Sequence, residues 1–207
     1  MGVLRITVDH TVRITAESAR VHVTVRGSST LAGGIAGRKA SLVRDIVAEL
    51  TGRGVTEDAV EVTSVRLAAS DGRLLKSQTV EIALVIPASP DQLPDILGVL
   101  SDRPGVSVDR LEWVYDEFEA SIPVTAAAMV MARRKADAVA AAAGLEVTGI
   151  ADASDSWSMP TPRMERARAD VMFAAASAGG PPLDLGVELN ATTELSVHLS
   201  VDFELSP

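Results

Sequence analysis

The chain contains no cysteine among its 207 residues. Without thiols it can form no disulfide, no thiolate zinc site, no iron–sulfur cluster and no cysteine nucleophile. Aromatic residues are scarce as well, because two Trp, one Tyr and three Phe are too few to build a surface on which nucleic-acid bases stack. Acidic residues outnumber basic ones by 28 to 19, and the net charge of −9 argues against nucleic acids and anionic membranes as partners.

Long apolar runs are missing too. The longest uninterrupted run, at residues 126–132, is far shorter than the roughly 18 residues that a membrane-spanning helix requires. At the start of the chain, Leu4, Ile6 and Val8 alternate with polar residues, which predicts a strand and not a signal peptide. We therefore expect a cytoplasmic protein with no membrane span.

Two apolar periodicities alternate along the chain. A period of two, as in Val21, Val23 and Val25, predicts strands with one buried face, and a helical stripe runs from Leu42 to Leu50. The predicted order of elements is ββ-α-ββ-α-β-α-β, then a long connection and a final β. This order predicts an α+β fold in which helices pack on a largely antiparallel sheet. We expect residues 1–207 to form a single domain.

Several local signals refine this prediction. The apolar phase changes between Val62 and Val65, which indicates a β-bulge. Asp71-Gly72 separates two alternating runs, as in a hairpin turn. Ser89 with Gln92 three residues later fits a capping box at the start of a helix. The strongest alternation is at residues 194–205, which predicts a closing strand with one buried face.

Four segments in order along the chain carry a family resemblance. They are ITAESARVHVTVRG (14–27), LVRDIVAELTGRGVTEDAVEVTSVRL (42–67), RRKADAVAAAAGLEVTGI (133–150) and ELSVHLSVDFEL (194–205). Together they resemble the SIMPL domain family. That resemblance implies an oligomer-forming α+β domain with no established chemistry, and it leads us to expect a stress-related role. Bacterial relatives in the family are often exported.

Few side chains offer catalytic or ligand chemistry. The candidates are His10, His22 and His198, and the acidic group Asp116, Glu117 and Glu119. Two of the histidines fall on polar strand faces, and the histidine spacing does not support a metal site. The acids lie between a strand and a helix start, where carboxylates interact favourably with the helix dipole. We predict no catalytic residue, no cofactor and no metal.

The long connection at about residues 157–186 interrupts the periodic pattern. Connections of this length are usually functional or disordered. Its candidate interface residues are Trp157, Met164, Val171, Met172 and Phe173, and its candidate rim or anion contacts are Arg163, Arg166 and Arg168. Apolar side chains on a loop are costly unless a partner covers them, so we expect this segment to mediate assembly.

Three functions are compatible with these observations. The leading hypothesis is a non-enzymatic, self-assembling domain that acts as a scaffold or binds a protein partner. The first alternative is a small-molecule or anion-binding protein whose pocket is lined by the 157–186 connection. The third is a hydrolase, which would need two carboxylates held at a fixed separation in a cleft.

Overall fold

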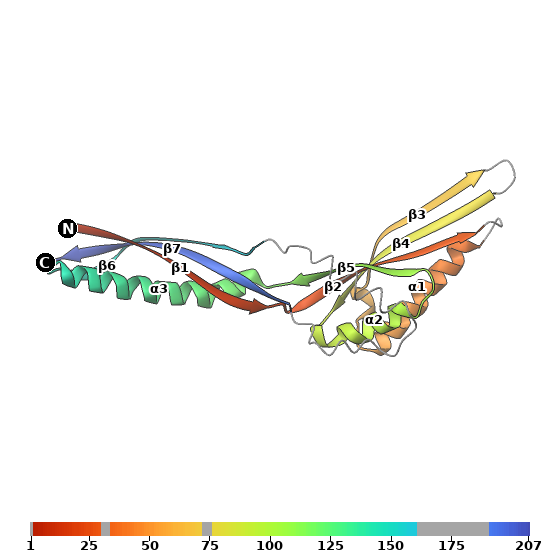
Figure 1. The fold of residues 1–207 in the computed structure, drawn as a ribbon, viewed down its shortest axis with the longest axis horizontal. Coiled ribbons are helices and arrows are strands. Elements are labelled where there is room, and N and C mark those ends of the chain that lie inside the picture. The colour runs from red at the N-terminus through yellow and green to blue at the C-terminus, as the bar shows by residue number, and fades with distance from the viewer. Residues whose placement is uncertain (1, 30–33, 72–75, 161–190) are drawn as a thin grey trace. The chain divides into compact units, whose positions relative to one another are not determined.

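The computed structural model describes residues 2–29, 34–71, 76–160 and 191–207. Its elements follow the predicted order, and the α+β class is confirmed. The described residues form two compact units (Figure 1). Unit 1 consists of residues 2–15, 115–160 and 191–207, and unit 2 consists of residues 16–114 with its two gaps. The region that we expected to fold as one domain thus contains two sheets, each with its own core.

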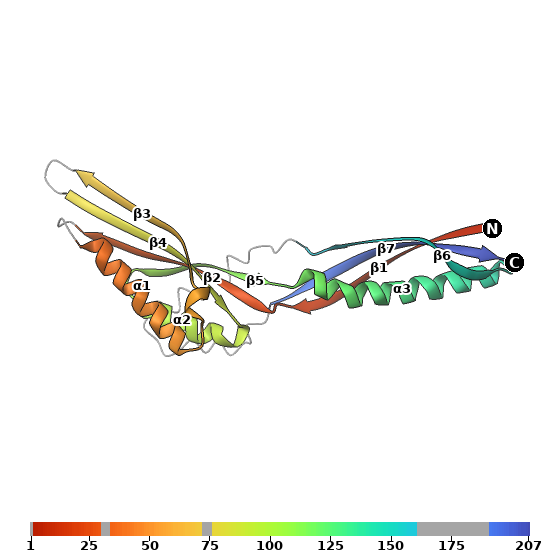
Figure 2. The same cartoon turned by 180° about the vertical axis from the view of Figure 1, so that it is seen from behind.

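Unit 2 contains an antiparallel four-stranded sheet. Its strand order is β3 (Glu61–Asp71), β4 (Lys76–Ala88), β2 (Ser18–Ser29) and β5 (Val106–Val114). The helices α1 (Ile35–Gly52) and α2 (Leu93–Ser101) lie on one side of this sheet, with β3 at its outer edge (Figure 2). Helix α1 packs on β2 and β4, and α2 packs on β5. The helices therefore cover one face of β4, β2 and β5.

Local signals in unit 2 are found where the sequence predicts them. The register of β3 against β4 shifts between Val62 and Ser64, which confirms the bulge. Ser89 and Gln92 form the predicted capping box, at the start of the short 3-10 helix η2 (Pro90–Gln92) that leads into α2. A second 3-10 helix, η1 (Glu57–Ala59), precedes β3. Strands β3 and β4 pair antiparallel up to their connection, of which residues 72–75 lie outside the described residues.

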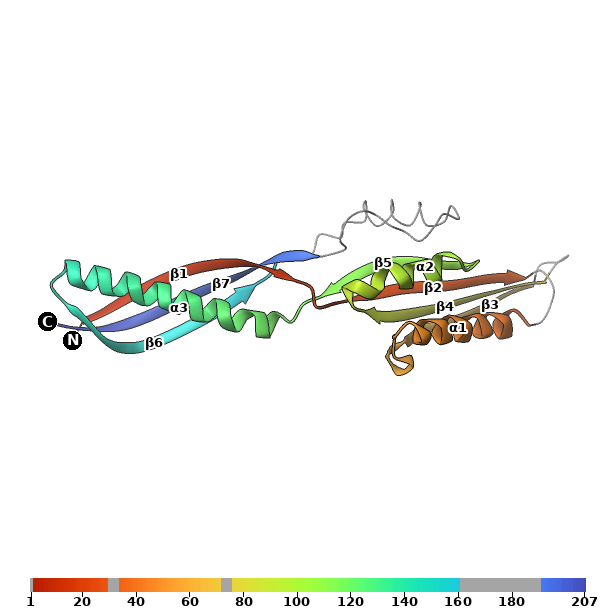
Figure 3. The same cartoon turned by 90° about the horizontal axis from the view of Figure 1, so that it is seen from below.

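Unit 1 contains a three-stranded antiparallel sheet with one long helix. Strand β7 (Thr192–Ser206) lies between β1 (Gly2–Thr15) and β6 (Glu146–Ser158). Helix α3 (Glu117–Ala142) runs along one face of this sheet (Figure 3). The strand expected at residues 145–150 is longer in the structure, because β6 continues beside β7 up to Ser158.

The core of unit 1 joins the closing strand to a stripe of small residues. Strand β7 contributes its alternate residues Leu195, Val197, Leu199, Val201 and Phe203, all of which are buried. Helix α3 faces them with buried residues four apart, namely Val124, Ala128, Ala132, Ala136 and Ala140. Because alanine extends little beyond the helix backbone, the helix can lie close to the sheet along this stripe.

We expect Val201→Asp to destabilise the protein strongly, because it places an unpaired charge at a position with 0% exposure. The expected loss is about 3 kcal/mol or more in the free energy of unfolding. The matched control is Ser200→Asp, since Ser200 lies on the polar face opposite Thr7. It should change stability by no more than about 0.5 kcal/mol. Chemical unfolding of both variants measures the difference, and equal losses would contradict this assignment of faces.

Candidate functional site

The face of the unit 1 sheet that no described helix covers carries polar pairs between β1 and β7. Arg5 donates from Nε and Nη2 to the two carboxylate oxygens of Asp202, at 2.6 Å each. Further along the same two strands, His198 Nδ1 lies 2.7 Å from Asp9 Oδ1. The bidentate hydrogen bonds from Arg5, together with its charge, hold the pKa of Asp202 below the ordinary aspartate value. These groups stabilise the strand pairing and leave Asp202 ionised.

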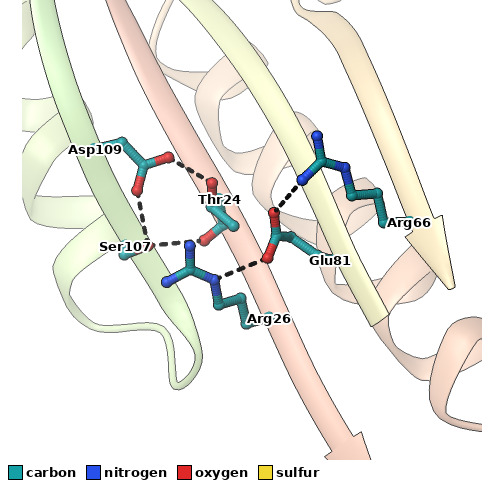
Figure 4. A network of polar contacts seen from close by, with 6 residues as sticks. All are labelled: Thr24, Arg26, Arg66, Glu81, Ser107 and Asp109. Carbon is teal, nitrogen blue, oxygen red and sulfur yellow. Dashed lines mark hydrogen bonds and ion pairs between the residues drawn. The ribbon is translucent and has the colours of Figure 1, made fainter. Parts of the chain in front are cut away.

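The face of the unit 2 sheet that the described helices leave free carries a second set of polar contacts (Figure 4). Asp109 on β5 accepts hydrogen bonds from Thr24 Oγ1 at 2.5 Å and from Ser107 Oγ at 3.2 Å. On the neighbouring strands, Glu81 accepts from Arg26 Nε at 3.2 Å and lies 3.9 Å from Arg66 Nη1. These two groups of contacts share β2 and together involve all four strands, with each carboxylate already bonded to neighbouring donors.

Two of the three candidate histidines, His22 and His198, take part in such cross-strand contacts, whereas His10 lies on β1 opposite Val197. His22 Nε2 lies 3.0 Å from Glu112 Oε2, and Arg110 reaches the same carboxylate oxygen at 3.4 Å. His198 is paired with Asp9, as described above. Within the described ranges, no group of three His, Asp or Glu side chains is arranged to hold a metal ion. Both histidines are therefore placed by sheet pairing.

The acidic group before α3 caps the helix, as predicted. Asp116 is the N-cap residue, and its Oδ1 accepts a hydrogen bond from the backbone N–H of Glu119 at 3.0 Å. Glu117 and Glu119 lie in the first turn, where the exposed N–H groups favour negative charge. The geometry of these three residues is explained by the start of the helix.

The expected interface in the long connection is described only at its beginning. We expected Trp157 to lie in a loop, but it lies near the end of strand β6, where it is paired with Val197. Its ring meets that of Phe118 on α3 edge-on, with ring centroids 6.2 Å apart, and 41% of Trp157 is exposed. The remaining predicted residues lie outside the described residues: Met164, Val171, Met172, Phe173, Arg163, Arg166 and Arg168.

The apolar surface of unit 2 lies on the edge strand β3, and sequence analysis did not single it out. Val62, Val65 and Leu67 are 55%, 58% and 67% exposed, and the described part of unit 2 exposes no other large apolar side chain to this degree. They pair with the buried residues Leu84, Ile82 and Val80 of β4. Directly paired residues share a face, so all three lie on the helix-covered side, beyond the cover of the helices.

The alternation in β3 was visible in the sequence as a strand signal. Alternation reports that a strand has an apolar face, but it does not report which strand stands at the edge of its sheet. That position follows from the order β3-β4-β2-β5, which joins segments far apart along the chain. We call the surface formed by Val62, Val65 and Leu67 the β3 apolar edge.

Fold and surfaces define an antiparallel α+β protein with helices on one face of each sheet. The chain belongs to the SIMPL family, which is described as "Protein of unknown function (DUF541)". The family model matches residues 4–203 and so spans both units. No curated protein matched the sequence. Among the described residues, none of the helices is both long and apolar enough to span a membrane.

The Arg5–Asp202 pair predicts an acid-dependent part of the stability. Because the pKa of Asp202 is lowered in the folded state, its ionised form stabilises the protein above the ordinary aspartate pKa. This contribution is lost as the pH falls through the lowered folded pKa, below about pH 4. We expect Asp202→Asn to be less stable than the parent at pH 7, with a difference that shrinks toward pH 2.

Chemical unfolding of both proteins at several pH values measures that difference. Arg103 also lowers the pKa of another carboxyl group, that of Glu49. Because Asp202→Asn leaves Glu49 and Arg103 unchanged, the Glu49 titration should cancel in the stability difference between parent and variant. A difference between parent and variant that stays constant from pH 7 to low pH would show that the Arg5–Asp202 pair does not titrate with folding.

Proposed function

We propose that this chain is a non-enzymatic protein that assembles with copies of itself and serves as a scaffold or a binding module. The observation that carries the proposal is the β3 apolar edge. Single exposed apolar side chains are common on protein surfaces, but three on one strand, on one face and at the edge of a sheet are a feature of interaction surfaces.

The position of these side chains on an edge strand adds a second driving force. The outer side of an edge strand presents backbone N–H and C=O groups that a further strand can pair with. An added strand would supply these hydrogen bonds and at the same time cover the side chains of Val62, Val65 and Leu67. Strand addition at a sheet edge is an established mode of protein recognition, in which the backbone gives affinity and the side chains give specificity.

The use of the polar side chains supports a non-catalytic role. Asp109 and Glu81 accept hydrogen bonds from neighbours on the same sheet. Asp202 is held by Arg5, and Asp116 caps α3. A catalytic acid or base has to be within hydrogen-bond reach of a substrate proton, whereas these carboxylates meet structural donors.

The test compares Val65→Lys with Ala68→Lys by light scattering over a range of concentrations. We expect the parent to exceed its monomer mass of 21.6 kDa as its concentration rises. Val65→Lys puts a charge into the apolar edge and should weaken assembly at least about tenfold. Ala68 is an exposed residue of the same strand, paired with Thr79 on the other face, so Ala68→Lys should assemble like the parent.

Thermal melts establish that both variants are folded, which we expect because both positions are exposed. A parent that remains monomeric at every concentration would refute self-assembly. Trp157→Ala tests the competing interface at residues 157–186. If that change weakens assembly while Val65→Lys does not, the contact surface lies at Trp157 on β6 and not at β3.

A further inference from the structure

The β3 edge is self-complementary in charge as well as apolar. Glu61 pairs with Val85 and Arg66 pairs with Glu81 of β4, so these two opposite charges lie on the polar face of the sheet. Val62 and Val65 lie on the other face, paired with Leu84 and Ile82. An acid and a base thus flank residues 63 and 64 on one face of the strand, and two valines flank them on the other.

We infer that β3 pairs with β3 of a second copy, antiparallel, in the register that places Glu61 of each copy opposite Arg66 of the other. The inference rests on the proposed self-assembly and names its contact. A two-fold axis perpendicular to the sheet, passing between Thr63 and Ser64, generates this register. It also places Val62 opposite Val65 twice, so that both faces of the joined strands are matched.

Both charged groups are available for such a contact. Within the described residues, the Glu61 side chain has no hydrogen-bond or ion-pair partner. Arg66 has only the 3.9 Å approach to Glu81, and its side chain is 78% exposed. Pairing across the axis would give two Glu–Arg contacts from one strand sequence. Other strands would have to offer the same charges at the same spacing.

The bulge puts both charges of β3 on one face. It lies between Val62 and Ser64, at the centre of the inferred pairing, and it adds one residue to β3 relative to β4. In a regular strand, residues five apart point to opposite faces. Because of the extra residue, Glu61 and Arg66 instead share the polar face, and Val62 and Val65 share the other. The inferred register therefore depends on the bulge.

A charge-reversal experiment tests the register. Glu61→Arg places two Arg–Arg contacts in the pairing of that variant with itself, and Arg66→Glu places two Glu–Glu contacts. We expect each variant alone to assemble about tenfold more weakly than the parent. In an equimolar mixture, arginine of one variant faces glutamate of the other at both contacts. The mixture should therefore recover assembly to within about threefold of the parent.

A matched control separates the contact from net charge. Arg44→Glu changes the charge of the chain by the same amount as Arg66→Glu, but Arg44 is exposed on helix α1. This variant should assemble like the parent. Light scattering of each protein and of the mixture provides the measurement, with thermal melts as the check on folding.

Single cysteines give a second measurement, without background because the chain has no cysteine of its own. Val62→Cys and Val65→Cys should be joined by a short bifunctional thiol reagent when the two variants are mixed. Each variant alone should be joined far less, because in the inferred register neither residue faces its own copy. Equal cross-linking within one variant would overturn the register.

The outcomes separate this inference from the proposed function. A parent that never assembles refutes both. A parent that assembles and loses assembly with Val65→Lys, while the charge-reversed variants behave like the parent, keeps the β3 interface and refutes the Glu61–Arg66 register. Loss of assembly in each charge-reversed variant and recovery in their mixture establishes the pairing of β3 with itself.

Discussion

Burial of one face of each antiparallel sheet under helices is the constraint on which the rest of this structure depends. In unit 1 it requires a helix with small residues on one side, because α3 lies along the buried side chains of β7 with Ala128, Ala132 and Ala136 between them. It also requires polar side chains at the alternate positions of the same strands. The contact between Arg5 and Asp202 is one consequence, since both lie on the face that no described helix covers.

The same constraint leaves part of unit 2 uncovered. Helix α1 packs on β2 and β4, and β3 lies one strand further out. Its apolar side chains continue the pattern of the buried face but remain exposed. An incompletely covered apolar face at a sheet edge is the physical basis of the proposed assembly. Glu61 and Arg66 add the charge pattern from which we infer that the partner is a second copy.

The polar networks connect strands within each sheet, whereas the proposed role of the β3 apolar edge is recognition. Glu81 contacts an arginine on each side. Its carboxylate accepts a hydrogen bond from Arg26 Nε at 3.2 Å, whereas Arg66 Nη1 comes no closer than 3.9 Å. The inner pair stabilises the sheet, while Arg66 at the edge keeps most of its surface in solvent. Charge is thus paired in the middle of the sheet and more available at its edge, which is compatible with the proposed pairing of β3.

Periodicity and capping chemistry in the sequence determined the kinds of element and their order. The alternation in β7, the bulge near Val62, the capping box at Ser89 and the N-cap at Asp116 were all predictable, because each depends on residues within one or two turns or strands. The sequence did not determine that the strands divide into two sheets, that Trp157 lies on β6, or that β3 is an edge. These features depend on which distant segments pair, as in β1 with β7. A local sequence pattern does not specify the strand with which it pairs. Only the tertiary structure decided which apolar strand face the helices would leave exposed.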